Sequence, residues 1–275
     1  MSSEHPRIAF IGGGNMARSI VGGLIASGHA PASIAVGEPS EEARARLSAL
    51  GPLETGTDNE AVVEGAALVL LALKPQVLQQ VATPLAPAIA RSGAVVMSIA
   101  AGVTVAMLER WLGAVPVVRC MPNTPALLGV GAAGLFANAA VDDAGRALAT
   151  RVMEAVGTVA WVKEEAQIDA VTAASGSGPA YFFLFMERMI EAAVAQGLDE
   201  STARTLVLQT ALGAARMATE AGDPPAELRR QVTSPGGTTA AALEAFEAGG
   251  LGDLVADAMD AAAARAESLA RELEG

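Results

Sequence analysis

Short apolar runs alternate with segments of helical periodicity from residue 7 to residue 162, and this alternation stops after Lys163. Such alternation is typical of βαβ units, which build a parallel sheet with helices on both faces. We expect strands over residues 7–11, 33–36, 67–72, 94–98, 115–119, 132–137 and 158–162, and helices over residues 16–27, 41–50, 75–90, 105–112 and 143–155. Residues 1–163 are therefore predicted to form a Rossmann-type α/β domain with a doubly wound, mostly parallel sheet.

Residues 164–275 carry no strand pattern and are rich in Ala and Leu, which predicts an all-helical second domain. The expected helices cover residues 181–196, 200–221, 238–248 and 251–273. Their sequences present more than one apolar stripe, for example Met186, Met189 and Ile190 beside Val194. A monomeric bundle could bury these stripes, and interlocking with a second copy could do so too; we favour the second copy.

Composition excludes several classes of function. A formal net charge of −12 argues against a general surface for nucleic acid or for an anionic membrane. The chain has one cysteine, Cys120, so an intramolecular disulfide and a cysteine-rich metal site are excluded, and no metal is predicted. No apolar run is long enough for a membrane helix, and residues 1–5 lack the features of a signal peptide. We expect a cytoplasmic protein.

The first predicted strand ends in a glycine-rich turn that opens a helix. Gly12 would allow the tight turn, Gly14 the close approach of a pyrophosphate, and Ala17 close packing of helix on strand. This spacing is weak evidence alone, but its place between an N-terminal strand and a helix predicts a dinucleotide site.

A second turn, over residues 233–239, lies between two helix-forming segments near the C-terminus. It combines hydroxyl side chains with Pro235, Gly236 and Gly237. A helix that starts there would present free backbone N–H groups beside hydroxyls, an arrangement that attracts a small carboxylate or phosphate. An ordinary joint between two helices is the structural alternative.

Three further segments could border a ligand. Lys74 and Pro75 follow an apolar strand, at the edge of a parallel sheet where ligands bind. The prolines of the segment 118–125 fix a rigid loop after another strand, and Cys120 within it is interpreted as a buried thiol rather than a nucleophile. In the segment 169–181 glycines permit a bend, and Ser175 offers a hydroxyl that we count among the substrate-binding candidates.

The two histidines, His5 and His29, lie outside all of these segments, so histidine-based acid–base catalysis is not expected. Hydride transfer to a protonated cyclic imine needs little acid–base help, because the acceptor is already cationic. It needs orientation, a dry pocket and a bound carboxylate, which Gly/Ser/Thr-rich turns can supply.

From residue 7 to about residue 254 the chain resembles Δ1-pyrroline-5-carboxylate reductase, the family that catalyses the last step of proline biosynthesis. The motifs that carry the resemblance are IGGGNMA (11–17), ALKPQ (72–76), RCMPNTP (119–125), DAVTAASGSGPA (169–180) and VTSPGGTT (232–239). Five motifs in this order are highly specific. The resemblance implies a reduced nicotinamide coenzyme, an imino acid substrate, and a homodimer formed through the C-terminal helices. In this family five dimers can assemble into a decamer.

The resemblance also implies roles for single residues. The residues expected to bind the pyrophosphate are Gly12, Gly14, Asn15 and Met16, and those expected to border the adenosine and nicotinamide are Asn59, Ala72, Leu73, Lys74 and Pro75. Ala100 and Ala101 are expected to flank the nicotinamide. The residues expected to hold the substrate carboxylate and ring nitrogen are Ser234, Gly236, Gly237, Thr238 and Thr239. Thr239 matches the family's threonine near the imine nitrogen and is the catalytic candidate, with orientation expected to outweigh proton donation.

The choice of coenzyme stays open. Glu38 follows the second predicted strand, at a place where an acid binds the adenosine ribose 2′-OH and repels a 2′-phosphate, which favours NADH. The family commonly uses NADPH, and Arg44 and Arg46 lie close enough in sequence to compensate. We take NADPH as the family default, with NADH as the alternative.

Two other functions fit part of the pattern. A 3-hydroxyacid dehydrogenase would share a sheet domain followed by helices, but that family relies on a lysine in a Gly-rich helix, and residues 166–181 contain no lysine. A coenzyme-sensing module without catalysis would bind the dinucleotide, but it leaves the turn at residues 233–239 unexplained.

Overall fold

The computed structural model describes residues 5–274, so residues 1–4, on which the expected lack of a signal peptide partly rests, lie outside it. The described residues form two compact units. The sheet unit comprises the chain up to residue 177 and again from residue 261, and the helical unit comprises residues 178–260. The predicted domain boundary after residue 163 stays a prediction.

The sheet unit is built on an eight-stranded sheet of order β3-β2-β1-β4-β5-β6-β7-β8, in which only the β6–β7 pair is antiparallel. The strands are β1 (Ile8–Ile11), β2 (Ile34–Gly37), β3 (Glu54–Gly56), β4 (Leu68–Leu71), β5 (Val95–Ser98), β6 (Val117–Met121), β7 (Gly131–Ala137) and β8 (Gly157–Trp161). The doubly wound, mostly parallel α/β fold predicted from the sequence is confirmed. The short edge strand β3 was not predicted, because its polar sequence ETG has no apolar alternation.

The helices of this unit are α1 (Asn15–Ala26), α2 (Glu41–Ser48), α3 (Asn59–Val63), α4 (Pro75–Ala82), α5 (Ala86–Ser92), α6 (Val105–Leu112), α7 (Asp143–Glu154) and α8 (Gln167–Val171). The single helix predicted over residues 75–90 is wrong. α4 ends at Ala82, a 3₁₀ turn covers Thr83–Leu85, and α5 then begins. Pro84 and Pro87 explain the interruption, since proline has no N–H for the helical ladder.

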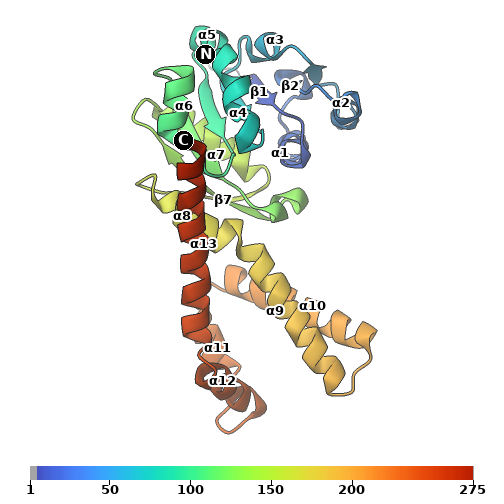
Figure 1. Cartoon of the computed structure of the whole chain (residues 1–275). Helices are drawn as coiled ribbons and strands as arrows, with labels where there is room; N and C mark the ends of the chain where they lie inside the picture. The colour runs from blue at the N-terminus through green and yellow to red at the C-terminus, as the bar shows by residue number, and fades with distance from the viewer. Residues whose placement is uncertain (1–4, 275) are drawn as a thin grey trace. The chain divides into compact units, whose positions relative to one another are not determined.

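The sheet separates two apolar cores. Successive residues of β1 point to opposite faces, so Ile8 and Phe10 pack with α1, α2 and α7, whereas Ala9 and Ile11 pack with α3 to α6 (Figure 1). All residues of β1, β2, β4 and β5 are buried, which matches their continuous apolar sequences. This arrangement leaves the carboxyl ends of the parallel strands as the edge where loops can hold a ligand.

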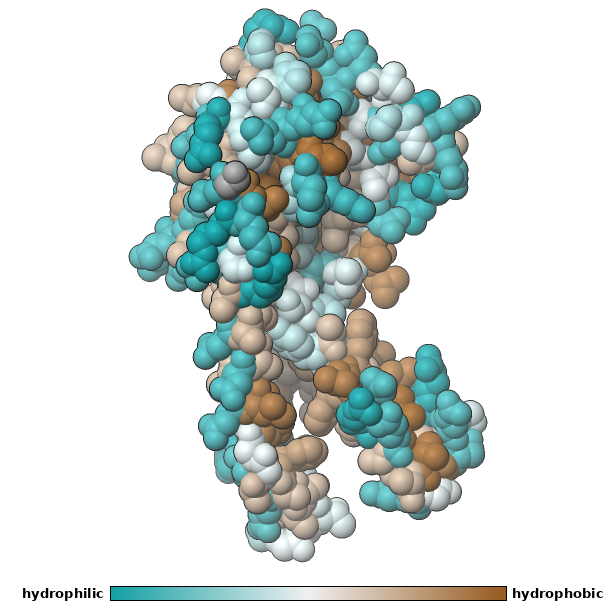
Figure 2. Space-filling model, viewed as in Figure 1, coloured by the Kyte–Doolittle hydropathy of each residue, from teal (hydrophilic) through white to brown (hydrophobic). Residues whose placement is uncertain are grey.

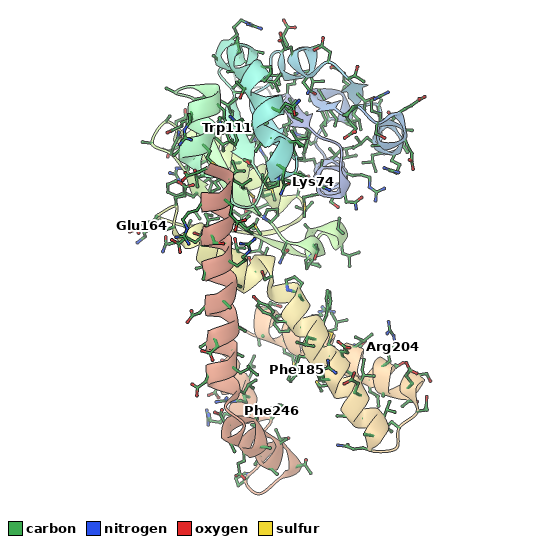
Figure 3. All side chains as sticks on the ribbon, in the orientation of Figure 1. Lys74, Trp111, Glu164, Phe185, Arg204 and Phe246 are labelled. Carbon is green, nitrogen blue, oxygen red and sulfur yellow. The ribbon has the colours of Figure 1, made fainter. Side chains whose placement is uncertain are left out.

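The helical unit contains α9 (Gly178–Ala195), α10 (Glu200–Glu220), α11 (Pro225–Gln231), α12 (Thr238–Ala248) and the first ten residues of α13 (Leu251–Glu274). Of residues 178–260 only Gly178, Ala203 and Val207 are buried. Within this unit Phe185 of α9 lies near Phe246 of α12, with ring centroids 6.0 Å apart (Figure 3).

Many large apolar side chains of the helical unit face solvent. Phe182 is 67% exposed, Leu212 55% and Leu254 65%, and Figure 2 shows apolar patches over these helices. None of the helices described by the structure combines the length and the apolar character needed to cross a membrane. The helical unit thus leaves large apolar side chains exposed on α9, α10, α12 and the start of α13.

Candidate active site

The glycine-rich turn after β1 fits closely against its neighbours. Gly12 has φ +99°, and its N–H donates to the carbonyl of Gly37 at 2.8 Å. A Cβ on Gly12 would lie 2.5 Å from the carbonyl oxygen of Ala72 and 2.9 Å from Leu73 Cδ2. Both the backbone conformation and the lack of space require glycine here, and the turn brings Gly12 together with Ala72 and Leu73.

The start of α1 is open to a ligand. Gly14 is the N-cap residue, no side chain caps the helix, and no atom lies within 4 Å of the place a Cβ would take. The N–H groups of the first helical turn, which begins at Asn15 and includes Met16 and Ala17, have no acceptor inside the helix. Ala17 is fully buried against the sheet. Free amides at the positive end of a helix fit a pyrophosphate, as the dinucleotide prediction requires.

Glu38 closes this turn from the neighbouring strand. Its Oε2 accepts the N–H of Gly13 at 2.8 Å, and its Oε1 accepts the N–H of Ser40 at 2.9 Å. Arg44 donates to the carbonyls of Glu38 and Pro39, at 2.7 Å each.

Arg46 pairs with Glu42 at 2.6 Å. Both arginines that could compensate for a 2′-phosphate therefore already have partners in their own segment. Asn59, at the start of α3, directly adjoins Gly37 and so borders the same turn.

The other coenzyme candidates lie at the ends of the next two strands. Lys74 is exposed and occupies the N-cap position of α4 without a capping hydrogen bond from its side chain; it precedes Pro75 in the first turn of that helix (Figure 3). Ala100, which is buried, and Ala101, which is exposed, follow β5. Because β1, β4 and β5 are parallel neighbours, these residues share the carboxyl edge of the sheet with Gly12. Their roles in coenzyme binding stay predictions.

Ser175 lies in a π-helical turn, Thr172–Gly176, that follows α8. Its hydroxyl donates to the carbonyl of Val171 at 3.0 Å, and its own carbonyl accepts from Asn123 Nδ2 at 3.0 Å. Asn123 Oδ1 in turn accepts the N–H of Ala132 at 2.9 Å. A π turn within a helix frequently marks a functional site. Substrate binding by Ser175 stays a prediction.

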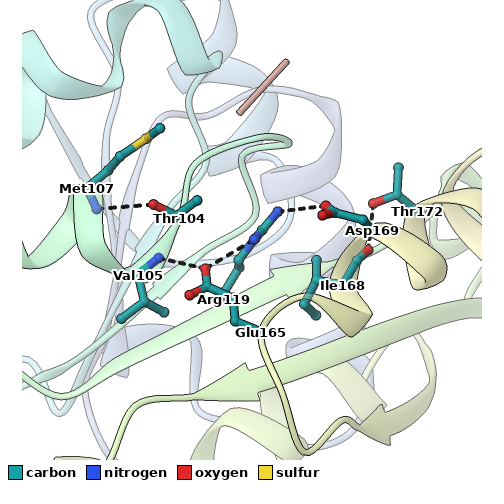
Figure 4. A network of polar contacts seen from close by, with 8 residues as sticks. All are labelled: Thr104, Val105, Met107, Arg119, Glu165, Ile168, Asp169 and Thr172. Carbon is teal, nitrogen blue, oxygen red and sulfur yellow. Dashed lines mark hydrogen bonds and ion pairs between the residues drawn. The ribbon is translucent and has the colours of Figure 1, made fainter. Parts of the chain in front are cut away.

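A buried ion-pair network beside this segment escaped the sequence reasoning (Figure 4). Arg119 of β6 is 5% exposed and contacts Glu165 Oε1 at 3.1 Å and Asp169 Oδ1 at 3.4 Å. Burial raises the pKa of Asp169, Arg119 opposes this shift, and Glu267 and Glu165 add to it. An arginine inside an otherwise apolar strand was the available signal, but its partners lie 46 and 50 residues away.

Cys120, next to Arg119, is a buried thiol, as expected. Complete burial strongly raises its pKa, so it stays protonated at neutral pH and is a poor nucleophile. Among residues 5–274 no three or more His, Cys, Asp or Glu side chains come together as a metal site.

The turn between α11 and α12 belongs to the helical unit. Gly236 has φ +68°, and Gly237 is the N-cap of α12 without a side-chain hydrogen bond. Ser234, Gly236, Thr238 and Thr239 are exposed, and the N–H of Gly237 donates to the carbonyl of Ser234 at 3.0 Å. The expectation of a helix start with bare N–H groups is confirmed, and its role as the substrate site stays a prediction.

Comparisons with known proteins match both the sheet region and the helical region of the chain. A family model described as pyrroline-5-carboxylate reductase dimerisation matches residues 165–269, and one described as NADP oxidoreductase, coenzyme F420-dependent, matches residues 7–102. The chain is 51% identical over 269 residues to a pyrroline-5-carboxylate reductase of Pseudomonas aeruginosa, covering 98% of both proteins.

Two solved structures are similar to this one. That of a pyrroline-5-carboxylate reductase from Coxiella burnetii has a TM-score of 0.94 and 46% identity, covering 97% of this chain and 99% of the other. That of Plasmodium falciparum pyrroline carboxylate reductase with NADP bound has a TM-score of 0.83 and 28% identity, covering 98% and 99%.

Proposed function

The chain belongs to the pyrroline-5-carboxylate reductase family, and from this premise we propose that it reduces (S)-1-pyrroline-5-carboxylate to L-proline with NADPH or NADH. The observation that carries the proposal is the uncapped, exposed start of α12 at Gly237, which offers N–H groups to a small carboxylate beside the hydroxyls of Thr238 and Thr239.

The reaction asks for positioning more than for acid–base chemistry. A bound reduced coenzyme would supply a hydride to the imine carbon, which is C2 of the pyrroline ring and becomes C5 of proline, and the two electrons of the C=N π bond would become the lone pair of nitrogen. The substrate arrives as a protonated iminium, so its imine carbon is already electrophilic. Hydride addition gives the neutral secondary amine, which then takes up a proton from solvent. Residues 234–239 hold the carboxylate and the ring nitrogen, and Thr239 orients the ring by a hydrogen bond.

The coenzyme is proposed to lie along the carboxyl edge of the sheet. The pyrophosphate binds at the free N–H groups after Gly14, and the nicotinamide lies near Ala100 and Ala101. A relative solved with NADP bound supports NADPH, whereas the carboxylate of Glu38 favours NADH.

A homodimer through the C-terminal helices is proposed as the functional form. The match to a dimerisation domain over residues 165–269 supports it, as do the exposed apolar faces of the helical unit. Assembly of five dimers into a decamer, the absence of nucleic-acid and membrane partners, and a cytoplasmic location stay predictions.

The proposal is tested by following the absorbance of NADPH and of NADH when purified protein meets the imine. We expect oxidation of the coenzyme with one proline formed per hydride transferred. A protein that binds coenzyme but does not turn over the imine would instead fit the sensing module.

The 3-hydroxyacid dehydrogenase alternative predicts reduction of NAD(P)+ by a 3-hydroxyacid. No specific observation favours it, since residues 166–181, which form α8, the π turn and the start of α9, contain no lysine. The same assay with a series of 3-hydroxyacids distinguishes the two enzymes.

A further inference from the structure

We propose that Glu165, held in place by Arg119, is a positioning residue that fixes the loop of residues 99–104, against which the nicotinamide lies in the proposed function. The inference rests on that function but gives roles to Glu165 and Arg119, neither of which is among the residues predicted to bind coenzyme or substrate.

Glu165 reaches the loop through the first turn of α6. Its Oε1 accepts two hydrogen bonds, one from the backbone N–H of Val105 at 2.8 Å and one from Arg119 Nη1 at 3.1 Å (Figure 4). Val105 is the first residue of α6, so its N–H has no acceptor within the helix. The hydroxyl of Thr104 accepts the N–H of Met107 at 3.2 Å. One carboxylate and one hydroxyl thus fix the point at which the loop becomes a helix.

The rest of the loop is held by close packing. At its start, buried Ser98 accepts the N–H of Ala100 through its hydroxyl at 3.3 Å. In the middle, Gly102 has φ +77°, and a Cβ there would lie 3.1 Å from Leu273 Cδ1 and 3.4 Å from the backbone nitrogen of Ala270. The end of α13 therefore packs on the loop. With Glu165 at the far end, the backbone of Ala100 and Ala101 is fixed from both sides.

Arg119 extends this support to the segment that carries Ser175. Its second arm contacts Asp169 at 3.4 Å, one turn before Thr172, whose hydroxyl donates to the carbonyl of Ile168 at 2.8 Å. Because Arg119 is nearly fully buried, its charge needs these two carboxylates, and loss of one leaves it poorly compensated. The network therefore couples the expected nicotinamide loop to the π turn after α8.

A positioning role makes a specific demand on kinetics. Hydride transfer depends steeply on the placement of the nicotinamide, and misplacement by about 1 Å can cost roughly 100-fold in rate. The adenosine and pyrophosphate candidates are on other loops, so overall coenzyme affinity should change little.

The test compares Glu165→Ala with Glu165→Gln, which retains an oxygen able to accept both hydrogen bonds. We expect Glu165→Ala to lower kcat by about 10-fold to 100-fold and to raise the kinetic isotope effect with 4-deuterated coenzyme, with KM for coenzyme changed by less than about 3-fold. Glu165→Gln, which keeps the acceptor but removes the charge beside Arg119, should fall between Glu165→Ala and the parent. Val105→Pro removes the N–H donor at a helix position that suits proline and replaces one small buried apolar side chain by another; it should reproduce Glu165→Ala.

The matched control is Glu54→Ala, which removes the carboxylate of another ion pair of the sheet unit, Arg7–Glu54 at 2.8 Å. It should lower kcat by less than about 2-fold. An unchanged kcat in both Glu165→Ala and Val105→Pro, or an equal loss in Glu54→Ala, overturns the inference.

A second readout separates failure of the inference from failure of the proposed function. If the parent does not reduce the imine, the fluorescence of bound NADPH still reports the surroundings of the nicotinamide. Glu165→Ala should then change this fluorescence while leaving the affinity for ADP-ribose, which lacks the nicotinamide, within about 3-fold. Unchanged fluorescence in a variant that binds NADPH overturns the inference in that case as well.

Discussion

The two units of this protein differ in how completely one chain can bury its apolar side chains. In the sheet unit, strands β1, β2, β4 and β5 are buried at every position, and helices cover both faces. In the helical unit only Gly178, Ala203 and Val207 are buried among residues 178–260. The first unit buries its own apolar core, whereas the second leaves most of its large apolar side chains exposed.

This difference indicates which part of the proposed active site one chain can form alone and which part needs a second chain. Burying one exposed Leu or Phe stabilises by about 1.5–3 kcal/mol, and contiguous apolar faces on monomers mark interfaces. We therefore infer that the proposed coenzyme edge forms within one chain, while the turn that is proposed to bind the substrate becomes rigid only when a second copy covers α9 to α13.

The largest expected effect comes from placing a charge on an apolar face of the helical unit. Leu212→Glu on α10 buries an unpaired carboxylate if a partner covers this face, at a cost of about 3 kcal/mol or more. We expect dissociation to monomers, measured by sedimentation, and loss of imine reduction by more than about 100-fold. Gln209→Glu, which introduces the same charge on the same helix, is the control. A dimeric Leu212→Glu variant would contradict the inferred interface.

In the sheet unit, the side chain introduced by Gly14→Leu should fill the space in which the pyrophosphate is proposed to bind. A leucine there projects into the region that is empty within 4 Å and blocks approach to the first turn of α1. Coenzyme affinity should fall by about 100-fold, because the N–H groups lose their ligand, while the dimer persists. Titration of NADPH fluorescence measures the affinity. Unaffected binding would move the pyrophosphate site elsewhere.

In the helical unit, Thr239→Val should impair catalysis with the imine and leave coenzyme binding intact. The substitution keeps the shape of the side chain and removes the hydroxyl that is proposed to orient the imine. We expect kcat/KM for the imine to fall by about 10-fold to 100-fold, with coenzyme affinity nearly unchanged. Steady-state kinetics combined with the same fluorescence titration checks both numbers. Equal losses in the two quantities would refute the assigned role.

A smaller effect is expected when Glu38 is replaced by serine. The carboxylate now binds Gly13 and Ser40 and would lie near a 2′-phosphate, whereas serine can donate to one. The ratio of kcat/KM for NADPH to that for NADH should rise by about 10-fold. Arg46→Ala, which removes an arginine already paired with Glu42, should change the ratio little. A ratio that does not move would show that Glu38 takes no part in coenzyme choice.

The smallest effect concerns pH and is confined to the sheet unit. His29 is 9% exposed, and burial lowers its pKa below the ordinary 6.5, helped by His5 and Arg151 and opposed by the Pro6 carbonyl. Below pH 6.5 the unfolded chain binds a proton that folded His29 resists, so stability should fall as pH drops from about 7.5 to 5.5. Thermal midpoints across this range should vary less in His29→Asn. Identical pH profiles would contradict the assignment.

The sequence predicted well what local patterns determine. Each buried strand was expected within a few residues of its observed position. A strand that is buried on both faces of a parallel sheet appears in the sequence as a short continuous apolar run. The turn before Thr238 was recognised because its residues suit a helix start. The break between α4 and α5 was not predicted, because the apolar spacing typical of a helix continues across it. Pro84 was the available signal for the break.

What sequence could not supply are contacts between distant segments. Glu165 reaches Val105 across 60 residues and Asn123 reaches Ser175 across 52, and no local pattern encodes either pair. The short strand β3 pairs at the sheet edge through its backbone, which any sequence can do. Such features follow from the assembled fold rather than from propensity or spacing.

The most direct test of the contrast between the units is hydrogen exchange of the full chain at high and low protein concentration, with the mass measured alongside. When dilution lowers the measured mass to that of one chain, the amides of α9, α10 and α12 should lose their protection from exchange, while those of β1, β4 and β5 keep theirs. The Leu212→Glu variant should show the same loss of protection at any concentration. A monomer whose helical unit is as protected as in the oligomer would contradict the account.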